Sequence, residues 1–197
     1  LEGESMFNDL REYIKQVEEW GECKVIEGAD WDVELGAISE LYIRTPNSPV
    51  LIFDKIKGYP QGYRVAMNVI VTPRRTALAL GLNTEAKGIE LLKAYRKKTK
   101  EMKLIPPVKV KTGPVEENIQ TGAKVDLLKF PSPKLHELDG GRYIGTCHAV
   151  IQQDPDTGYV NLGAYRVMLV DRNRLALHIL EGQHGDIIMH DKYFKRG

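Results

Sequence analysis

The sequence predicts an α/β N-terminal domain followed by a second domain of antiparallel strands. From Phe7 onward, apolar residues recur at steps of three and four and are interrupted by short apolar runs. This pattern is typical of helices that pack beside buried strands. After residue 140, strand-like segments are separated by turn sequences at hairpin spacing, which indicates an antiparallel meander. The 197 residues suffice for one large domain or two small ones.

The first two predicted elements are amphipathic helices, each with one apolar side facing the interior. The first ends at Gly21. Its apolar residues are Phe7, Leu10, Ile14, Val17 and Trp20. The second is predicted from Asp32 to Arg44, before Pro46 and Pro49 break the chain. Its expected inward residues are Val33, Ala37, Ile38 and Leu41.

Two strands and two more helices complete the first domain. The apolar run from Val50 to Phe53 predicts a buried strand, and Tyr63 to Val71 is predicted as another. Thr72-Pro73 is a favourable helix start, because the hydroxyl can cap the helix and proline suits its first turn. Gly81 closes that helix, and a last one runs from Thr84 to about Thr99.

The segment from Lys93 to Lys103 is rich in lysine and arginine, so a nucleic-acid interface has to be weighed. It holds a single tyrosine, and its charges better fit a solvated helix face. The whole chain has 28 basic and 27 acidic residues, a formal net charge of +1. No strong field therefore draws it to nucleic acid or an anionic membrane. No apolar run is long enough to span a bilayer.

Proline and glycine breaks after Lys100 separate the two predicted domains. We assign 6–104 to the α/β domain, 105–130 to a linker and 131–197 to the second domain. Its predicted strands are 143–152, 159–170 and 175–180, with turns at 154–158 and 171–174. Such a meander belongs to a sandwich or a barrel. The residues after Gly185 resemble the opening of another helix.

Cys23 and Cys147 are the only cysteines. Two cysteines so far apart make neither a disulfide framework nor a CxxC metal motif, which favours buried thiols in a reducing, cytoplasmic setting. The first residues have no signal-peptide pattern. Residues 1–5 precede Met6, the expected natural start, and are interpreted as a remnant of expression.

Three polar residues near the end of the chain are candidates for chemistry. Asn161 can offer an amide oxygen to a hard cation, Arg166 can bind a carboxylate or phosphate in bidentate fashion, and His184 can bind a metal. Each also has an ordinary interpretation: a turn asparagine, a surface arginine and a surface histidine. In a regular strand Asn161 and Arg166 lie on opposite faces. A bulge at Gly163 would bring them to one side.

The chain holds no nucleophile–base motif, no P-loop and no GxGxxG motif. The other histidines, His136, His148, His178 and His190, have less to support a functional role. From the residues alone, an anion or metal site in the second domain stays one alternative beside a purely structural role.

Longer stretches carry a resemblance to a known family. FNDLREYIKQVEEWGE, DWDVELGAISELYIR, PVLIFDKIKGYP and NVIVTPRRTALALG resemble the N-terminal domain of the UbiD family of decarboxylases. DGGRYIGTCHAVIQQDPDTGYVNLGAYR and the EGQH run resemble the cofactor-binding domain of that family. The resemblance extends over nearly all of the chain from Met6 onward.

The resemblance implies that the second domain is part of an antiparallel split β-barrel of the flavin reductase-like, FMN-binding type. It implies prenylated FMN, Mn²⁺ and K⁺ as cofactors. Asn161 and His184 match the family's metal ligands, and Arg166 matches the catalytic arginine that holds the substrate carboxylate. The implied cofactor-binding residues are Asn161, Leu162, Gly163, Ala164, Tyr165, Arg166, Gln183 and His184.

The activity implied is a carboxy-lyase that reversibly removes CO₂ from an aromatic or α,β-unsaturated carboxylic acid. The implied partners are that acid, further copies of the chain in a dimer or hexamer, and a flavin prenyltransferase that supplies the cofactor. The family's glutamate metal ligand and two further glutamates fall beyond Gly197. We therefore expect an N-terminal fragment that is inactive alone. The alternatives are a non-catalytic flavin-binding or assembly module and an accessory subunit of a multi-chain carboxylase.

Overall fold

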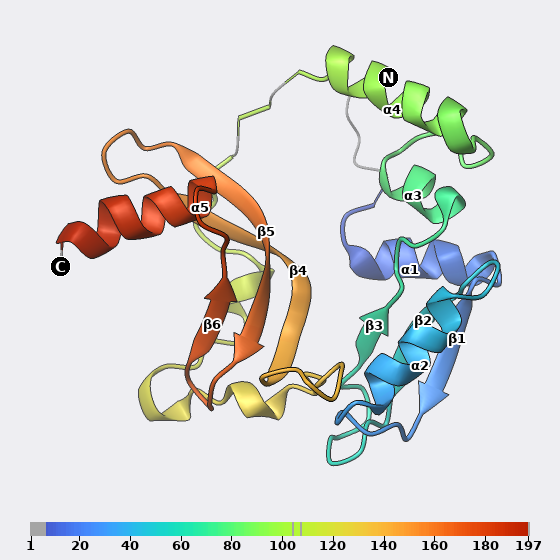
Figure 1. Cartoon of the computed structure of the whole chain (residues 1–197), viewed down its shortest axis with the longest axis horizontal. Helices are drawn as coiled ribbons and strands as arrows, with labels where there is room; N and C mark the ends of the chain where they lie inside the picture. Colours follow the sequence, from blue (N-terminus) through green and yellow to red (C-terminus); the bar gives the residue numbers. More distant parts are fainter. Residues whose placement is uncertain (1–6, 104, 107, 197) are drawn as a thin grey trace.

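The structure of the chain, a computed structural model, describes residues 7–103, 105–106 and 108–196. The expected start at Met6 lies outside the described residues. Figure 1 shows two groups of elements: a small α/β unit built from the first hundred residues, and an antiparallel sheet with a helix at the C-terminal end.

The α/β unit contains a sheet in the order β1-β2-β3. β1 (Cys23–Glu27) is parallel to β2 (Val50–Asp54), and β3 (Val65–Met67) is antiparallel to it. β2 is confirmed as a buried strand. The prediction of a strand over 63–71 was too long, because only three residues pair with β2. β1 was not predicted: it is a sheet edge, with burial that follows neither a helix nor a strand pattern.

The unit has four helices: α1 (Leu10–Glu19), α2 (Glu34–Ile43), α3 (Pro73–Ala79) and α4 (Gly88–Glu101). Asp9 caps α1 by accepting hydrogen bonds from the backbone of Arg11 and Glu12. Thr72 caps α3 in the same manner, with Pro73 in the first turn as predicted. α4 begins four residues later than the predicted Thr84 and buries none of its residues, as the solvated-helix interpretation expects.

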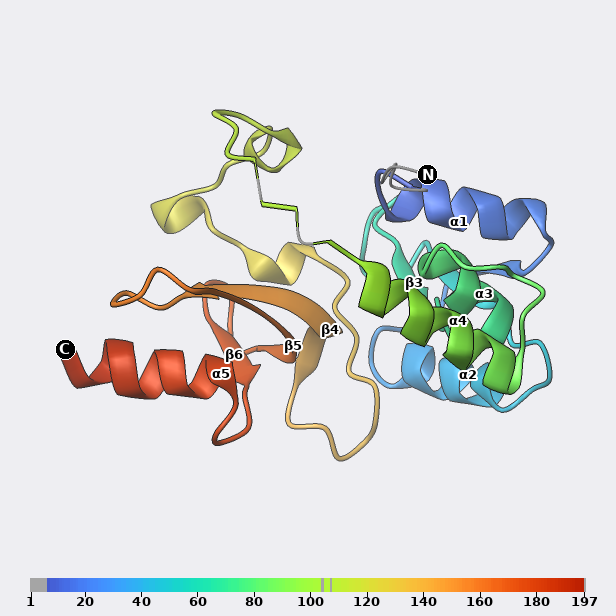
Figure 2. The same cartoon turned by 90° about the horizontal axis from the view of Figure 1, so that it is seen from above.

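The core has two halves because successive side chains of β2 point to opposite faces of the sheet. Val50 and Ile52 pack with Val17 of α1 and Leu78 of α3. The other half lies under α2 and consists of Ala29, Leu35, Leu51, Phe53 and Ile56. Each buried Val, Leu, Ile or Phe side chain in these two halves contributes roughly 1.5–3 kcal/mol on burial. The sheet is thus covered by helices on both faces (Figure 2).

The predicted inward face of α2 was partly wrong: Ile38 packs against the core as expected, but Ala37 is exposed. Leu41 is 70% exposed, whereas the buried residues are Leu35, Gly36 and Ser39. Val33 adopts a left-handed backbone conformation with φ of 57°, so the helix begins at Glu34, two residues later than predicted. The face predicted for α1 was also partly wrong, since Tyr13 is buried and Leu10 is half-exposed.

The second unit is the predicted antiparallel meander. Its strands are β4 (Arg142–Gln153), β5 (Val160–Leu169) and β6 (Leu175–His178), in the order β4-β5-β6. Asp154 stabilises the β4–β5 turn by accepting from the backbone of Asp156 and Thr157. In the described part of the chain these strands form an open sheet. The split β-barrel therefore stays a prediction.

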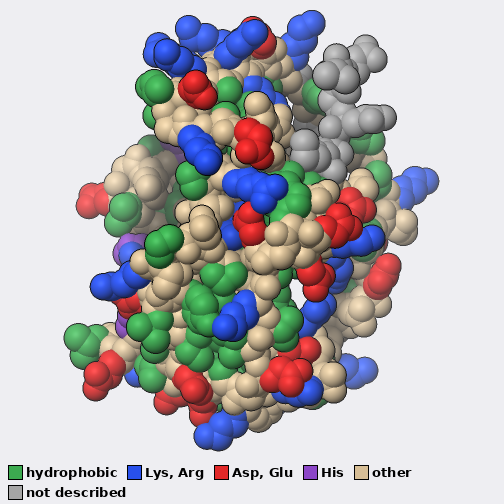
Figure 3. Space-filling model, turned by 90° about the vertical axis from the view of Figure 1, so that its right-hand side faces the viewer, with side chains coloured by type: hydrophobic (Ala, Val, Ile, Leu, Met, Phe, Trp, Pro, Cys, Tyr) green, Lys and Arg blue, Asp and Glu red, His purple; other side chains and the backbone are tan. Residues whose placement is uncertain are grey.

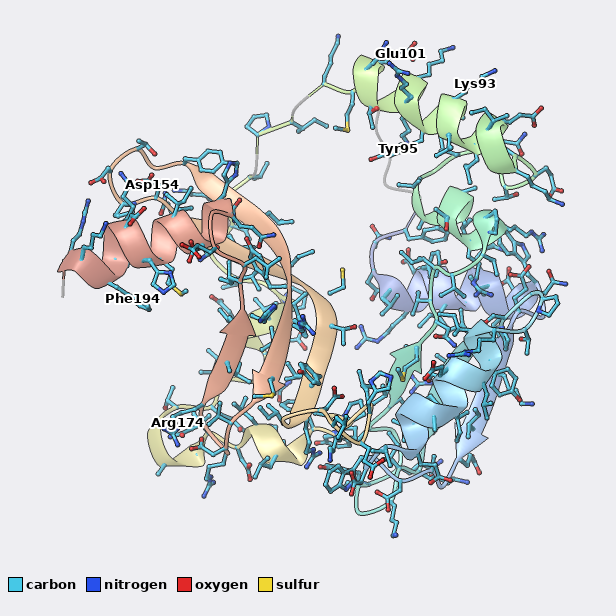
Figure 4. All side chains as sticks on the ribbon, in the orientation of Figure 1. Lys93, Tyr95, Glu101, Asp154, Arg174 and Phe194 are labelled. Carbon is cyan, nitrogen blue, oxygen red and sulfur yellow. The ribbon has the colours of Figure 1, made fainter. Side chains whose placement is uncertain are left out.

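Short helical segments occupy the linker and the C-terminal end. The linker holds η1 (Pro114–Glu116), η2 (Gly122–Lys124) and η3 (Leu127–Lys129). The predicted C-terminal helix is confirmed as the run α5 (His184–Asp186), η4 (Ile187–Tyr193) and η5 (Phe194–Arg196). Figure 4 shows Asp154 at the β4–β5 turn alongside this helix, and Arg174 at the opposite end of the sheet.

A strap of residues 130–142 joins the two units. The backbone N–H of Lys134 donates to the carbonyl of Trp31 at 3.0 Å, and that of Val33 donates to the carbonyl of Lys134 at 2.9 Å. The guanidinium of Arg142 lies 4.0 Å from the centre of the Trp31 ring and donates to the carbonyl of Ser132 at 2.7 Å. The strap therefore fixes the start of β4 to the α/β unit, whereas the domain boundaries stay a prediction.

Figure 3 shows how charged and hydrophobic side chains are distributed on one face of the molecule. Lys and Arg side chains gather at the top of the face in Figure 3, where α4 lies, and hydrophobic side chains lie on its lower half. Among the described helices, none has the length and apolar character needed to cross a membrane. The expectation of two buried thiols was wrong for Cys147, which is exposed on β4, and Cys23 is only half-buried.

Candidate functional site

β5 presents the predicted site residues on two opposite faces. Asn161 and Tyr165 are buried, at 6% and 8% exposure, whereas Leu162, Ala164 and Arg166 are exposed. The alternation runs through Gly163 without a break. The bulge suggested at Gly163 was therefore wrong: pairing there is regular, and the register shifts lie in β4, on both sides of Gly145.

Glycine is needed at position 163 for packing. A Cβ atom there would lie 2.3 Å from Cε2 of Tyr165, whose ring covers the same face of the sheet. Gly163 thus gives Tyr165 room to lie flat along β5 beside Asn161.

The turn that carries His184 lies against the face of Asn161. Gln152, paired with Asn161 across the hairpin, donates from Nε2 to the carbonyl of Gly185 at 3.1 Å. Asn161 in turn donates from Nδ2 to Gln152 Oε1 at 3.4 Å. Gly185 is buried, and a Cβ there would lie 2.5 Å from both Gln152 Oε1 and Tyr165 Oη. This close fit holds the turn against β5.

His184 itself stays accessible. It is exposed, and its ring meets the ring of Tyr159 edge to face at 6.0 Å between centres. Gln183, also exposed, closes the turn by accepting a hydrogen bond from the backbone of Leu180 at 3.3 Å. The predicted metal ligands Asn161 and His184 therefore belong to two elements that one glutamine connects.

Arg166 lies on the other face, where it pairs in register with His178 of β6. Its side chain makes no hydrogen bond or ion pair with any other residue that the structure describes. The ordinary interpretation of a surface arginine paired with a neighbouring acid is therefore not met, and its guanidinium is available for an anion. Leu162 and Ala164 share this face with it.

The chemistry of the two donors suits part of a divalent cation's shell, because an amide oxygen and an imidazole are both ligands that Mn²⁺ accepts. No group of three or more histidine, cysteine, aspartate or glutamate side chains that could hold a metal occurs among the described residues. Asn161 and His184 thus fit as two ligands of a larger set.

Sequence reasoning missed Gln152. Its only signal was its place in the hairpin: with the turn at 154–158, strand alternation puts Gln152 opposite Asn161. A polar residue in a strand is otherwise ambiguous, and its second partner, Gly185, lies 33 positions further along the chain.

Asp156 anchors the C-terminal helix to the β4–β5 turn. It is bonded to Arg196 and, at 2.9 Å, to Lys192. The hydrogen bond from Arg196, followed by that from Lys192, lowers the pKa of Asp156 below its ordinary value of 3.8. A carboxyl with a lowered pKa in the folded state contributes stability above its ordinary pKa and loses it as the pH falls through the lowered pKa.

We therefore expect the helix over residues 187–196 to loosen below about pH 3.8. The measurement is amide hydrogen exchange of this helix relative to β4 and β5, after brief exposure to pH values between 7 and 2.5. Asp156→Asn is the control, because it removes the titrating group and should show faster exchange of the helix already at pH 7. Equal pH dependence in the variant would contradict the assignment to Asp156.

Two family models match the chain in order. One described as the 3-octaprenyl-4-hydroxybenzoate carboxy-lyase N-terminal domain matches residues 14–95. One described as the 3-octaprenyl-4-hydroxybenzoate carboxy-lyase Rift-related domain matches residues 107–197. The first falls on the α/β unit, and the second on the linker, the strap and the meander.

Several proteins similar to this chain are named as decarboxylases. The pyrrole-2-carboxylic acid decarboxylase of Pseudomonas aeruginosa is 35% identical over 189 residues, covering 91% of this chain and 38% of that protein. The structure of vanillic acid decarboxylase from Sedimentibacter hydroxybenzoicus, in an open form, matches with a TM-score of 0.78 and 27% identity over 94% of this chain and 39% of that one.

A third similar structure is an evolved dimeric form of the UbiD-class enzyme HmfF from Pelotomaculum thermopropionicum, in complex with prFMN. It has a TM-score of 0.72 and 25% identity, over 94% of this chain and 41% of that one. The chain thus spans about two fifths of the length of these relatives. With two domain models matched in order and relatives of this kind at both the sequence and the structural level, the chain belongs to the UbiD family of decarboxylases.

Proposed function

We propose that this chain is the N-terminal part of a prenylated-FMN-dependent decarboxylase that reversibly removes CO₂ from an aromatic or α,β-unsaturated carboxylic acid. The observation that supports it most is Arg166, an exposed strand arginine without a described partner, on the strand that also carries Asn161. Relatives named for the decarboxylation of pyrrole-2-carboxylic and phenolic acids support the same reaction type.

In this proposal Asn161 and His184 would hold Mn²⁺, which would neutralise the charge of the bound cofactor together with K⁺. Gln183 would contact the flavin, and Leu162, Gly163, Ala164 and Tyr165 would do so through their backbone. The prenylated flavin, when bound, supplies the electron sink for the electrons of the broken C–C bond. Asn161 contributes through its amide oxygen, and the turn of His184 is held by the tight contact of Gly185 with Gln152 and Tyr165.

Arg166 holds the carboxylate of the substrate. A guanidinium donates two parallel hydrogen bonds to a carboxylate and so fixes the plane of the group that leaves. Rigid placement on β5 keeps the orientation that the reaction needs. The partners in this proposal are the acid, further copies in a dimer or hexamer and a flavin prenyltransferase that supplies the cofactor.

A second candidate function is a non-catalytic flavin-binding or assembly module, or an accessory subunit of a multi-chain carboxylase. The observation that favours it is the lack, in the described part of the chain, of a group of acidic and histidine side chains able to complete a metal shell. The acids needed for a complete shell would then come from another chain or be absent.

The test is decarboxylation by the protein of the whole reading frame, loaded with prenylated FMN and Mn²⁺. We expect Arg166→Ala to lower kcat/KM by about 100-fold or more, the cost of a misplaced reacting group, while flavin binding, read from its absorbance, is kept. Arg174→Ala is the matched control: this exposed arginine is paired with Asp171 at the far end of the sheet and should leave kcat/KM unchanged. Full activity of the Arg166 variant would eliminate the role proposed for it, and no activity of the wild-type protein on any such acid would favour the non-catalytic module.

A further inference from the structure

Gln152 connects the two residues of the proposed metal pair. From its place on β4 it reaches Gly185, next to His184, with its Nε2 at 3.1 Å from the carbonyl oxygen. Its Oε1 lies 3.4 Å from Nδ2 of Asn161. One side chain therefore ties the buried asparagine of β5 to the turn that carries the histidine.

The carbonyl of Gly185 sets the direction of these hydrogen bonds. A backbone carbonyl oxygen only accepts, so the atom of Gln152 that faces it must be the amide nitrogen. The amide oxygen of Gln152 then faces Asn161. Since that oxygen also only accepts, Asn161 must turn its nitrogen to Gln152. The orientation of both amides thus follows from backbone chemistry, although their O and N atoms have nearly the same shape.

The same chain of bonds leaves Oδ1 of Asn161 directed away from Gln152. No described residue donates to this oxygen. The oxygen is open to solvent and therefore to a ligand. The residue as a whole is only 6% exposed, so the side chain has little freedom to turn. An amide oxygen attracts a hard cation, whereas the amide nitrogen, which carries only donors, repels it.

We propose that Gln152 is a positioning residue, which holds Asn161 with its oxygen toward the cation and holds the turn of His184 against β5. This proposal rests on the metal role proposed above for Asn161 and His184. Gln152 acts through Asn161 and Gly185 and does not itself bind the metal. The missing Cβ of Gly185 is part of the arrangement, because any side chain there would collide with Gln152 Oε1 at 2.5 Å.

The experiment compares two neighbouring glutamines in the full chain. Gln152→Met keeps the length and volume of the side chain but removes both hydrogen bonds. Gln153→Met is the control: Gln153 is the next residue of β4, is exposed, and also donates to a backbone carbonyl, that of Gly158 at 3.3 Å. Thermal unfolding of each variant shows that it is folded before binding is measured.

The first readout is the Kd for Mn²⁺, measured by electron paramagnetic resonance. We expect Gln152→Met to weaken binding about 10- to 100-fold, as loss of a partner that orients a metal ligand does, and Gln153→Met to leave it within about twofold. The inference is overturned if the folded Gln152 variant binds Mn²⁺ as tightly as the wild type, or if the Gln153 variant loses as much affinity.

The second readout separates this inference from the metal role itself. Without metal, the side-chain amide protons of Asn161 should exchange slowly with solvent in the wild type and in Gln153→Met, and rapidly in Gln152→Met. If Mn²⁺ broadens neither Asn161 nor His184 in the NMR spectrum of the wild type, the metal role fails. The exchange rates still decide whether Gln152 orients Asn161: equal rates in all three proteins would refute it.

Discussion

Arg75→Leu should lower the free energy of unfolding by about 3–5 kcal/mol, the summed cost of leaving several acceptors without the donor that serves them. Arg75 has no exposed surface, although it carries a charge. Its guanidinium donates to the carbonyls of Val69 and Asn68, each at 3.1 Å, and to Glu22 at 3.4 Å. Leucine fills part of the space but leaves these acceptors in the interior without their donor.

The neighbouring arginine supplies the control. Arg74 contacts the same glutamate at 2.8 Å and stacks on Trp20, but its side chain is 40% exposed. We expect Arg74→Leu to cost about 1 kcal/mol or less, as exposed ion pairs do. Both variants are measured by urea unfolding at pH 7. Similar losses in the two variants would show that the ion pair with Glu22 decides the loss of stability. The burial of Arg75 and its hydrogen bonds to backbone carbonyls would then not matter.

The elements of the α/β unit that the sequence predicts correctly are those with a clear pattern of apolar residues within the element itself. The run VLIF of β2 is apolar on both faces because helices cover both, and this pattern is unambiguous in the sequence. β1 has charged Lys24 and Glu27 among apolar residues, and its pairing with β2 joins segments 27 positions apart, as Cys23 with Val50. Such non-local parallel pairing leaves no periodic signal.

The second unit was predicted more closely because hairpins are local. The turn at 154–158 and the one at 171–174 fix the register of their strands, so the faces of Asn161 and Arg166 follow from counting. The bulge predicted at Gly163 was wrong because a strand can contain glycine for two different reasons, irregular pairing or close packing. Gly145 accompanies the irregular pairing, and a Cβ there would lie 2.2 Å from the His148 ring, whereas Gly163 makes room for Tyr165.

The candidate site was predictable only in part. Asn161, Arg166 and His184 stand out by residue type, but the contact that joins two of them depends on Gln152, whose partner Gly185 comes from a separate element. A strand glutamine is ordinary in sequence, and only the packing of α5 on β5 gives it a role.

Gly36→Ala should separate the strap from the α/β unit. An alanine Cβ at this position would lie 1.9 Å from the backbone oxygen of Leu135 and 2.6 Å from its carbonyl carbon. Backbone atoms cannot turn aside as a side chain does, so either α2 or the strap must move. The loss is expected at about 3 kcal/mol or more, at the upper end of the cost of overpacking. The direction of the change in stability is informative, because alanine in place of glycine inside a helix otherwise stabilises by about 1 kcal/mol.

The consequence extends to the second unit, since the strap also carries the bonds of Lys134 to Trp31 and Val33 and leads into β4. We expect the Trp31 fluorescence of Gly36→Ala to change, because Arg142 no longer lies over its ring. Amide hydrogen exchange should become faster in residues 130–142 than in the wild type, while exchange in β2 is still slow. Gly113→Ala is the control, as a Cβ at Gly113 meets no atom within 4 Å, and it should leave both signals unchanged. A Gly36 variant that is as stable as the wild type, or more stable, would mean that α2 and the strap are not in the contact that joins the two units.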